Sequence, residues 1–441
     1  MSSACGPHPK NRLPLMLNRI KEVAAASRRR LLRSTPSDGR RAFMTTLGHV
    51  NPIVAVETRD APIHTFLGHI IDNPSIYNII FCLCPAITLV RLLQTCSRVR
   101  AAVMDYMSYN FSVDRLLSRY FSHPITFRYI QARSATIISG STALQFFDRT
   151  FYPESDLDLY IPMAWRERLG CYLLNEGYTF SPSPKQHPTF HIAVSDREVL
   201  SSRGRYGHLK AIAGVFNFTK LTALGQLRIQ MMVAVRSTLE VILNYHSTCV
   251  MNLITFDKAY CLYPRATLED RTSLICTSRD DEVIERVYDR YRERGWTMVT
   301  SYEQVEPLTL PSLQVGLPRS IEGGYTWVIT LPCDFYNLIL PVTPRSTPLT
   351  SDPVSASSWT LVENNEAGPH MKFGNITHPQ LFYAYVLSTT RVMRLPAMRL
   401  LMEMASRANF HPPRQFSVEN HQYVDERFIQ LYREFLNIIL P

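Results

Sequence analysis

Residues 137–161 read IISGSTALQFFDRTFYPESDLDLYI, and this stretch is more informative about the protein than any other part of the sequence. Its apolar start predicts a short strand that runs into a helix at Gly140-Ser141. The turn-rich segment 152–155 then leads to a second strand that opens with Asp156-Leu157-Asp158. The stretch therefore predicts a strand, a helix and a second strand, with polar groups gathered where these elements meet.

Two carboxylates are predicted to share one face of the second strand. Residues two apart in a strand project from the same side, so Asp156 and Asp158 should point the same way. At a separation of about 4 Å and an effective dielectric of about 20, two such charges repel by roughly 4 kcal/mol. A divalent cation, above all Mg²⁺, is the usual compensation where phosphates are handled. Asp156 and Asp158 are therefore candidate metal ligands and catalytic residues.

The strand-to-helix turn supplies a candidate anion site. Backbone N–H groups at a helix N-terminus attract negative charge, and a glycine there allows a phosphate to approach closely. Gly140 and Ser141 stand at this turn, so we expect them to bind phosphate.

A Gly-Ser pair that opens a helix, followed by Asp-x-Asp on the next strand, resembles the nucleotidyltransferase fold over roughly residues 125–250. That superfamily includes poly(A) polymerases, antibiotic nucleotidyltransferases and toxin-type relatives. The resemblance implies a mixed-sheet α/β core in which Gly140-Ser141 holds the phosphates of a nucleoside triphosphate. It also implies that Asp156 and Asp158 bind Mg²⁺, and that a third carboxylate on a later strand completes a two-metal site. The 14 residues between Ser141 and Asp156 are a long spacing for the family.

The third carboxylate is missing from the sequence. Two further strands are expected at 212–218 and 227–235, joined by a turn near Gly225. The second carries Gln230 where the resemblance calls for Asp or Glu, and an amide is a poorer magnesium ligand than a carboxylate. Arg228 lies on the same face, where it could neutralise the two aspartates or contact a nucleotide phosphate. The sequence thus predicts an impaired site.

Residues 76–103 resemble an F-box, the helical module that docks substrate receptors onto the linker subunit of a cullin-type ubiquitin ligase. The resemblance rests on Ile80-Phe81, Leu83 and Pro85, then Leu89, Leu92 and Leu93, and finally Cys96-Ser97-Arg98-Val99-Arg100. It implies that Leu89 and Leu92 or Leu93 anchor the linker subunit. A plain pair of core helices gives the same pattern. A membrane span is excluded, because the apolar run 79–90 is far shorter than the roughly 20 residues that a bilayer requires.

Composition indicates an intracellular globular protein of two or three domains. The nine cysteines show no metal-binding spacing and are expected to be buried, reduced thiols. Residues 1–50 contain ten of the 47 Lys and Arg but two of the 37 Asp and Glu, so the other 391 residues carry 37 and 35. This balance does not support broad nucleic-acid binding by the folded body. The basic start is typical of a solvated tail, a nuclear localisation patch or a mitochondrial targeting segment, and we expect a cytoplasmic or nuclear protein.

The remaining segments carry weaker patterns. Helical periodicity is expected at 238–256, which includes His246 as a hydrogen-bonded helix residue, and at 281–294, which ends at Gly295. Strands are expected at 296–300 and 325–331. The predicted organisation is a basic disordered tail (1–60), an F-box-like helical segment (61–124), a nucleotidyltransferase-like core and extension (125–340), a Pro/Ser/Thr-rich linker or loop (341–375) and a C-terminal helical region (376–441) that includes 379–393 and 423–440.

The sequence therefore predicts an α/β protein with a mixed-sheet core and flanking helical regions, similar to lineage-expanded fungal proteins that combine these two features. Its expected function is nucleotide binding or scaffolding by a catalytically impaired nucleotidyltransferase fold. An active Mg²⁺-dependent nucleotidyltransferase and an F-box substrate adaptor are the alternatives.

Overall fold

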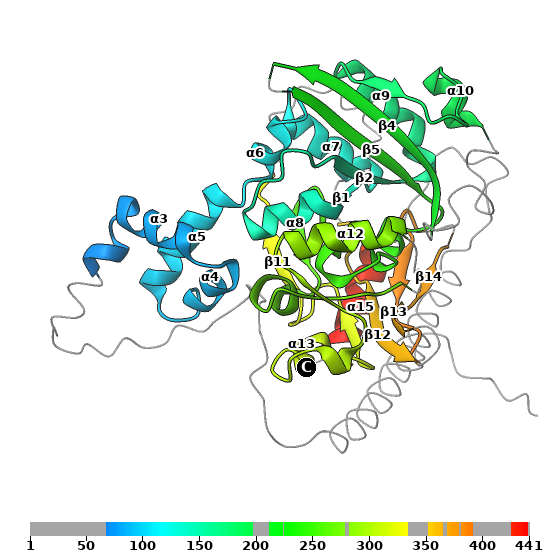
Figure 1. The fold of residues 1–441 in the computed structure, drawn as a ribbon. Coiled ribbons are helices and arrows are strands. Elements are labelled where there is room, and N and C mark those ends of the chain that lie inside the picture. The colour runs from blue at the N-terminus through cyan, green and yellow to red at the C-terminus, as the bar shows by residue number, and fades with distance from the viewer. Residues whose placement is uncertain are drawn as a thin grey trace, which may run out of the picture.

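The computed structural model describes residues 68–196, 211–223, 225–277, 282–333, 352–364, 368–378, 381–390 and 425–439. The predicted basic tail (1–60), the segment 197–209 and the parts 341–351 and 365–367 of the predicted linker lie outside these residues. Within them the architecture is mixed α/β, as predicted (Figure 1). No helix in the described ranges is long and apolar enough to cross a membrane.

A mixed sheet of eight strands organises the described residues. Its order is β11-β7-β6-β1-β2-β5-β4-β3, and β2 and β5 are its one parallel pair among these strands. The strands are β1 (Ile137–Ser139), β2 (Leu157–Pro162), β3 (Thr179–Ser181), β4 (Ile212–Thr222), β5 (Gly225–Ala234), β6 (Asn252–Ile254), β7 (Lys258–Cys261) and β11 (Trp327–Thr330). The predicted strands at 137–138, 156–160, 212–218 and 227–235 are all confirmed.

The two faces of the sheet have different surroundings, as the alternating side chains of β2 show. Leu157, Leu159 and Ile161 are buried in a core with residues of α9 and α10, such as Leu173 and Phe190. Helices α7 (Pro124–Ser134), α9 (Arg166–Asn175) and α10 (Phe190–Ser195) cover this side (Figure 1). The intervening residues of β2 face the opposite side, where the sheet borders a cavity.

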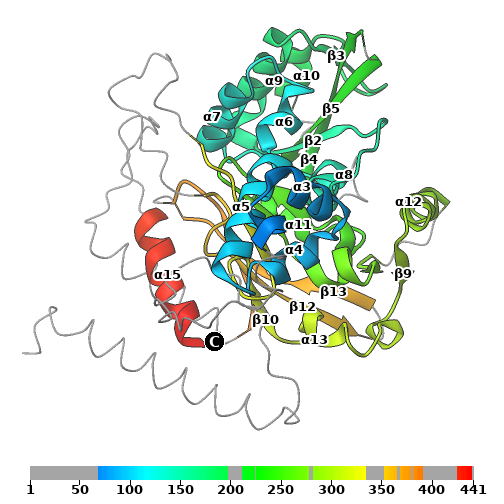
Figure 2. The same ribbon diagram turned by 90° about the vertical axis from the view of Figure 1, so that its left-hand side faces the viewer.

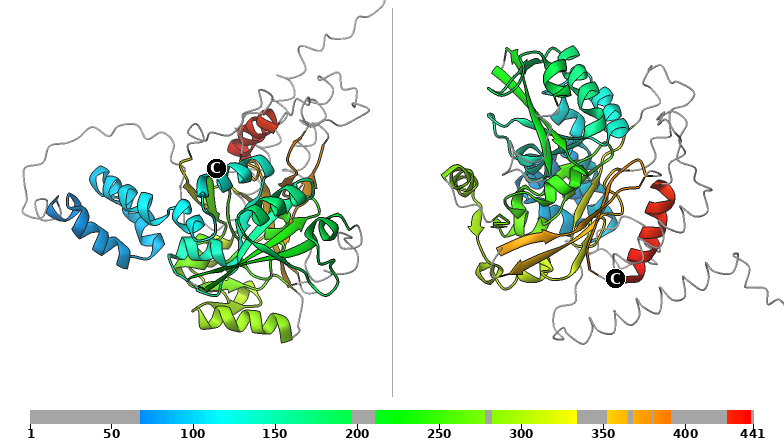
Figure 3. Two further views of the ribbon diagram at one scale, coloured as in Figure 1. Left: turned by 90° about the horizontal axis from the view of Figure 1, so that it is seen from above. Right: turned by 90° about the vertical axis from the view of Figure 1, so that its right-hand side faces the viewer.

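The F-box-like segment is helical, but it is not a separate unit. It consists of α3 (Pro74–Leu83), α4 (Ala86–Leu92), α5 (Ser97–Asn110) and α6 (Val113–Ser118), and α3 to α5 project from one side of the molecule (Figures 1 and 3). Phe111 packs edge-on against Phe146 and Trp327, with ring centroids 5.8 and 5.5 Å apart. The helices therefore share one hydrophobic core with the sheet.

The predicted linker anchors differ in exposure. Leu89 is fully buried, whereas Leu92 and Leu93 are partly buried against the same core. Anchoring of a linker subunit by Leu92 or Leu93 stays a prediction. A different stripe is exposed, formed on α3 by Ile76, Ile79, Ile80 and Leu83.

The predicted linker or loop and the first predicted C-terminal helix are wrong where the structure describes them. A hairpin of β12 (Ser358–Asn364) and β13 (Gly368–Lys372) pairs with β10 (Pro318–Ser320), and β14 (Gly374–Ile376) pairs with β15 (Tyr385–Leu387). Buried Trp359 and Leu361 give this hairpin an apolar face that the Pro- and Ser-rich composition concealed. The last predicted helix is confirmed as α15 (Asp425–Ile439).

The predicted helix at 238–256 is also wrong. It divides into α11 (Thr238–Leu243), a short 3₁₀ turn at Thr248–Val250 and strand β6. The break follows from Asn244, whose side-chain amide donates to the Glu240 carbonyl at 2.8 Å and ends the helix. His246 lies in the bend after α11 and contacts Ser247 Oγ through Nδ1 at 2.8 Å.

The helix predicted at 281–294 and the strands predicted at 296–300 and 325–331 are confirmed. Helix α12 (Glu282–Glu293) stops shortly before Gly295, whose φ is +94°, and the strands β9 (Thr297–Val299) and β11 follow. A second parallel pair joins β9 to β8 (Thr272–Leu274), and α13 (Leu310–Leu313) completes the described helices.

The eight cysteines in the described residues are free, as expected, but among them only Cys249, Cys261 and Cys276 are buried.

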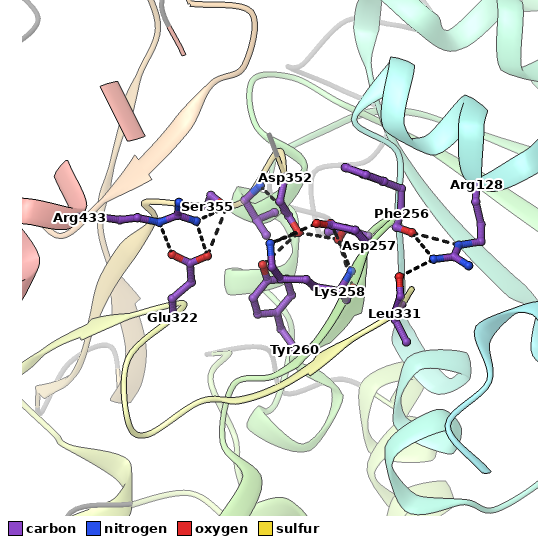
Figure 4. Close-up of polar contacts among 12 residues, drawn as sticks. Arg128, Phe256, Asp257, Lys258, Tyr260, Glu322, Leu331, Asp352, Ser355 and Arg433 are labelled. Atoms are coloured by element: carbon purple, nitrogen blue, oxygen red, sulfur yellow. Dashed lines mark hydrogen bonds and ion pairs between the residues drawn. The ribbon is translucent and has the colours of Figure 1, made fainter. Parts of the chain in front are cut away.

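Polar contacts attach segments near the C-terminus to the rest of the described fold (Figure 4). Asp352 accepts hydrogen bonds from Thr255 Oγ1 at 2.7 Å and from Tyr260 Oη at 3.0 Å. On α15, the Arg433 guanidinium donates two hydrogen bonds to Glu322, at 2.7 and 2.6 Å. Figure 2 shows α15 and α12 on opposite sides of the molecule, so this attachment is remote from the cavity that α12 borders.

Candidate functional site

A cavity of about 1890 Å³ adjoins the face of the sheet opposite to α7, α9 and α10. It is lined by the end of α6, the start of α8 (Gly140–Asp148), the loop before β2, the strands β2 and β5, the turn after α11 and one side of α12. All six site residues predicted from the sequence line it, namely Gly140, Ser141, Asp156, Asp158, Arg228 and Gln230. The structure thus brings the predicted residues together from four elements.

The two aspartates reach the start of α8 through the pairing of β1 with β2. Asp158 lies directly opposite Ser139, the residue that precedes α8. Gly140 has a φ of +67°, and a Cβ atom at this position would overlap the Asp158 carboxylate. Only glycine allows this approach, so the Gly-Ser turn and the Asp-x-Asp strand meet in space.

The start of α8 has donors available for an anion. Ser139 is the N-cap residue, but its hydroxyl donates to the Asn252 carbonyl and makes no capping hydrogen bond to the first turn. N–H groups of an uncapped first turn require partners from outside the helix. The arrangement fits the phosphate-binding expectation for Gly140 and Ser141.

The long spacing between Ser141 and Asp156 is taken up by a loop that is fastened to α8. Ser141 Oγ contacts Ser155 Oγ at 3.2 Å, and Thr142 Oγ1 donates to the Asp156 carbonyl at 2.8 Å. The Tyr152 N–H donates to Gln145 Oε1 at 2.6 Å. The additional residues therefore form part of the cavity wall and do not separate the two halves of the site.

Electrostatics at the aspartate pair favour protonation of the deeper carboxyl. Burial, and to a smaller extent the charge of Asp156, raise the pKa of Asp158 to about 8. Burial also raises the pKa of Asp156, while the positive charges of Arg228 and Arg290 act to lower it. Positive charges therefore oppose the effect of burial at Asp156, whereas none does so at Asp158.

Gln230 lies beside the aspartate pair in the sheet. In the parallel pair of β2 and β5 it lies directly opposite Asp158. Its Nε2 donates to Asn217 Oδ1 at 3.1 Å, and Asn217 is its partner on β4. This hydrogen bond holds the Gln230 amide in place, so that Gln230 and Asn217 form a neutral pair beside Asp158.

Arg228 lies beside Asp156 in the sheet. Leu157 pairs with Ile229, so Asp156 and Arg228 precede that pair on adjacent parallel strands and line the cavity together. Strand alternation predicted that Arg228 lies on the same face as Gln230, and both residues line the cavity.

Sequence reasoning missed the contribution of α12 to the site. Arg290 of α12 and Arg294 in the turn directly after it line the cavity, and the Arg294 guanidinium lies 3.9 Å from the ring centroid of Tyr152 in the loop. Arg115 of α6 and Arg119, the C-cap residue of that helix, also line it. The spacing of Arg290 and Arg294 by four residues places both on one side of a helix, but it does not reveal which surface that side faces.

The donor set does not fit two divalent metals. Among the described residues no group of three or more His, Cys, Asp or Glu side chains is arranged to hold a metal ion. Asp156 and Asp158 supply two carboxylates, whereas Gln230 and Arg228 occupy the positions beside them. A two-metal centre would lack a ligand and would have a guanidinium group as its neighbour.

No family model, curated protein or solved structure matches the chain.

Proposed function

We propose that this protein has a nucleotidyltransferase-like core that binds a nucleoside triphosphate in the cavity and transfers its nucleotidyl group very slowly or not at all. The observation that carries the proposal is the pairing of Gln230 with Asp158 in the sheet. It puts a neutral, already bonded amide where the transfer reaction requires a third carboxylate.

The cavity offers complementary groups for such a ligand. The uncapped start of α8 supplies N–H donors for phosphate, and the arginines supply positive charge. The volume of about 1890 Å³ exceeds the range of about 300–1,000 Å³ that is common for small-molecule sites, and leaves room for more than a nucleotide.

The expected loss of turnover follows from the loss of charge stabilisation. A second metal would activate the attacking hydroxyl, and each 1.4 kcal/mol of lost transition-state stabilisation slows a reaction about tenfold. Without the carboxylate that holds this metal, we expect a loss of several orders of magnitude.

Nucleotide binding and transfer are tested on the same protein. Titration calorimetry with ATP, GTP, CTP and UTP is expected to give measurable binding for at least one of them. When the wild type is incubated with α-labelled nucleotides and Mg²⁺, we expect no more labelled product than the Asp156→Ala variant forms under the same conditions. Mg²⁺-dependent incorporation that Asp156→Ala abolishes would support the alternative of an active nucleotidyltransferase.

A second candidate function rests on the surface of α3. Ile76, Ile79, Ile80 and Leu83 follow the spacing i, i+3, i+4, i+7 and are between 39% and 80% exposed. Such a stripe suits insertion of a helix face into an apolar groove, which is how an F-box substrate adaptor would engage the ligase linker subunit.

The adaptor function is tested by capture of the full chain on recombinant linker subunit. Retention that Ile79→Asp abolishes would favour it. Leu308→Asp is the matched control, since Leu308 is 77% exposed and lies elsewhere on the surface. A folded full chain that is not retained would exclude this function.

A further inference from the structure

Two guanidinium groups face the cavity without a carboxylate in ion-pair contact. Arg228 on β5 and Arg290 on α12 both line it and are exposed to it. In the described part of the chain, neither forms an ion pair within 4 Å, whereas neighbouring Arg292 on α12 contacts Glu285 and Asp289 at 2.6 and 2.7 Å. Cations that converge on a cavity without partners point to an anionic ligand.

The two arginines converge on the aspartate pair from different elements. Arg228 stands beside Asp156 across the parallel strands β2 and β5. Arg290 comes from α12, which the contact of Arg294 with the Tyr152 ring holds near the loop before β2. Both positive charges act to lower the pKa of Asp156 against the larger effect of burial, so the two arginines supply part of the compensation that a metal would give this carboxylate.

We propose that the cavity binds the triphosphate of its nucleotide through Arg228 and Arg290, together with the start of α8, and needs no divalent metal to do so. This inference rests on the proposed function. Each guanidinium presents a planar fork of donors that matches two phosphate oxygens. In all, five arginines line the cavity (Arg115, Arg119, Arg228, Arg290 and Arg294) against four carboxylates (Glu154, Asp156, Asp158 and Glu293).

A metal at the aspartate pair would work against this arrangement. An ion next to Asp156 would share its neighbourhood with the Arg228 charge, and the two cations repel. Gln230 cannot compensate, because its amide bears no charge and is bonded to Asn217. Magnesium bound to the triphosphate would moreover neutralise oxygens that the arginines bind.

The test is calorimetric titration of the full chain with ATP, GTP, CTP and UTP, in excess EDTA and in excess MgCl₂ at equal ionic strength. We expect binding in EDTA that is at least as tight as in MgCl₂, to within about threefold. Binding that is tenfold or more tighter in MgCl₂ would overturn the inference and leave the proposed function standing. Absence of binding in both buffers would overturn both.

Variants identify the groups that bind. Arg228→Gln and Arg290→Gln should each weaken binding about tenfold or more in EDTA, and Arg228→Lys should weaken it less because it keeps the charge. Arg292→Gln is the matched control on the same helix and should leave the affinity unchanged. Unaltered binding by both folded Gln variants at positions 228 and 290 would also overturn the inference.

Discussion

At the scale of single residues, the site depends on a contact between Gly140 and Asp158. The backbone of Gly140 has a φ of +67°, which disfavours residues with a side chain, and the Asp158 carboxylate occupies the place of a Cβ atom. Gly140→Ala therefore combines backbone strain with a steric clash. We expect it to reduce the free energy of unfolding by about 2 kcal/mol or more, measured by chemical denaturation.

Gly316→Ala separates these two contributions. Gly316 has a φ of +77°, but nothing lies within 4 Å of a Cβ at that position. This variant should show the strain alone, at about 1 kcal/mol. Equal losses for the two variants would mean that Asp158 does not lie against Gly140.

Asp158 also gives the protein a pH dependence of definite sign. Its pKa is raised from 3.8 to about 8, so between these values the folded state keeps a proton that the unfolded state releases. The contribution of Asp158 to stability is therefore present below about pH 4 and is lost as the pH rises toward 8. Asp158→Asn keeps the shape and removes the titration. Its melting temperature relative to the wild type should increase between pH 5 and pH 8.5.

The surface variant Asp289→Asn controls for the loss of a carboxylate outside the cavity. Asp289 is exposed on α12, where it contacts Arg292. A difference between wild type and Asp158→Asn that does not change with pH would contradict the assignment of a raised pKa to Asp158.

At the scale of elements, strand β5 decides whether the aspartates can form a metal site. Gln230→Asp places a third carboxylate opposite Asp158, and Arg228→Gln removes the neighbouring positive charge. The double variant should gain a magnesium-dependent increase in melting temperature of about 2 °C or more, because a bound ligand stabilises the folded state. The wild type should show no such increase. Differential scanning calorimetry in EDTA and in MgCl₂ measures both.

Local patterns predicted the elements that carry the site. Alternation placed Asp156 with Asp158, and Arg228 with Gln230, because the period of two in a strand is independent of the rest of the fold. The same reasoning failed at 358–387, where the strands β12, β13 and β15 depend on partners such as β10. Their pairing is a long-range property that a Pro- and Ser-rich composition does not express.

At the scale of the whole molecule, the N-terminal helices and the sheet share one hydrophobic core. Arg149 at the end of α8 donates to the Phe81 carbonyl at 3.1 Å and to Tyr106 Oη at 2.7 Å, which joins α8 to α3 and α5. Phe111 continues this connection into the core beside Trp327.

Phe111→Ala tests this coupling. It should cost about 3–5 kcal/mol, because a large buried ring is removed from a packed core. The loss should appear in a single unfolding transition seen by both tryptophan fluorescence and circular dichroism. Tyr109→Ala, at a side chain that is 61% exposed, is the control and should change stability little. Two separate transitions would show that the helices unfold on their own.

The cavity itself could not be predicted from the sequence, because the residues that line it are far apart along the chain. Arg115 and Arg290 line the same cavity although 174 residues separate them, and no short sequence motif indicates that they lie near each other. Only the tertiary arrangement reveals that arginines from α6, β5 and α12 surround the aspartate pair.

The most direct measurement of the central claim is a crystal structure of the full chain with a non-hydrolysable ATP analogue, grown in the presence of MgCl₂. We predict that the triphosphate lies between the start of α8 and the guanidinium groups of Arg228 and Arg290, with no metal bridging it to Asp156 and Asp158. A triphosphate bound outside the cavity, or two magnesium ions held by Asp156 and Asp158, would contradict it.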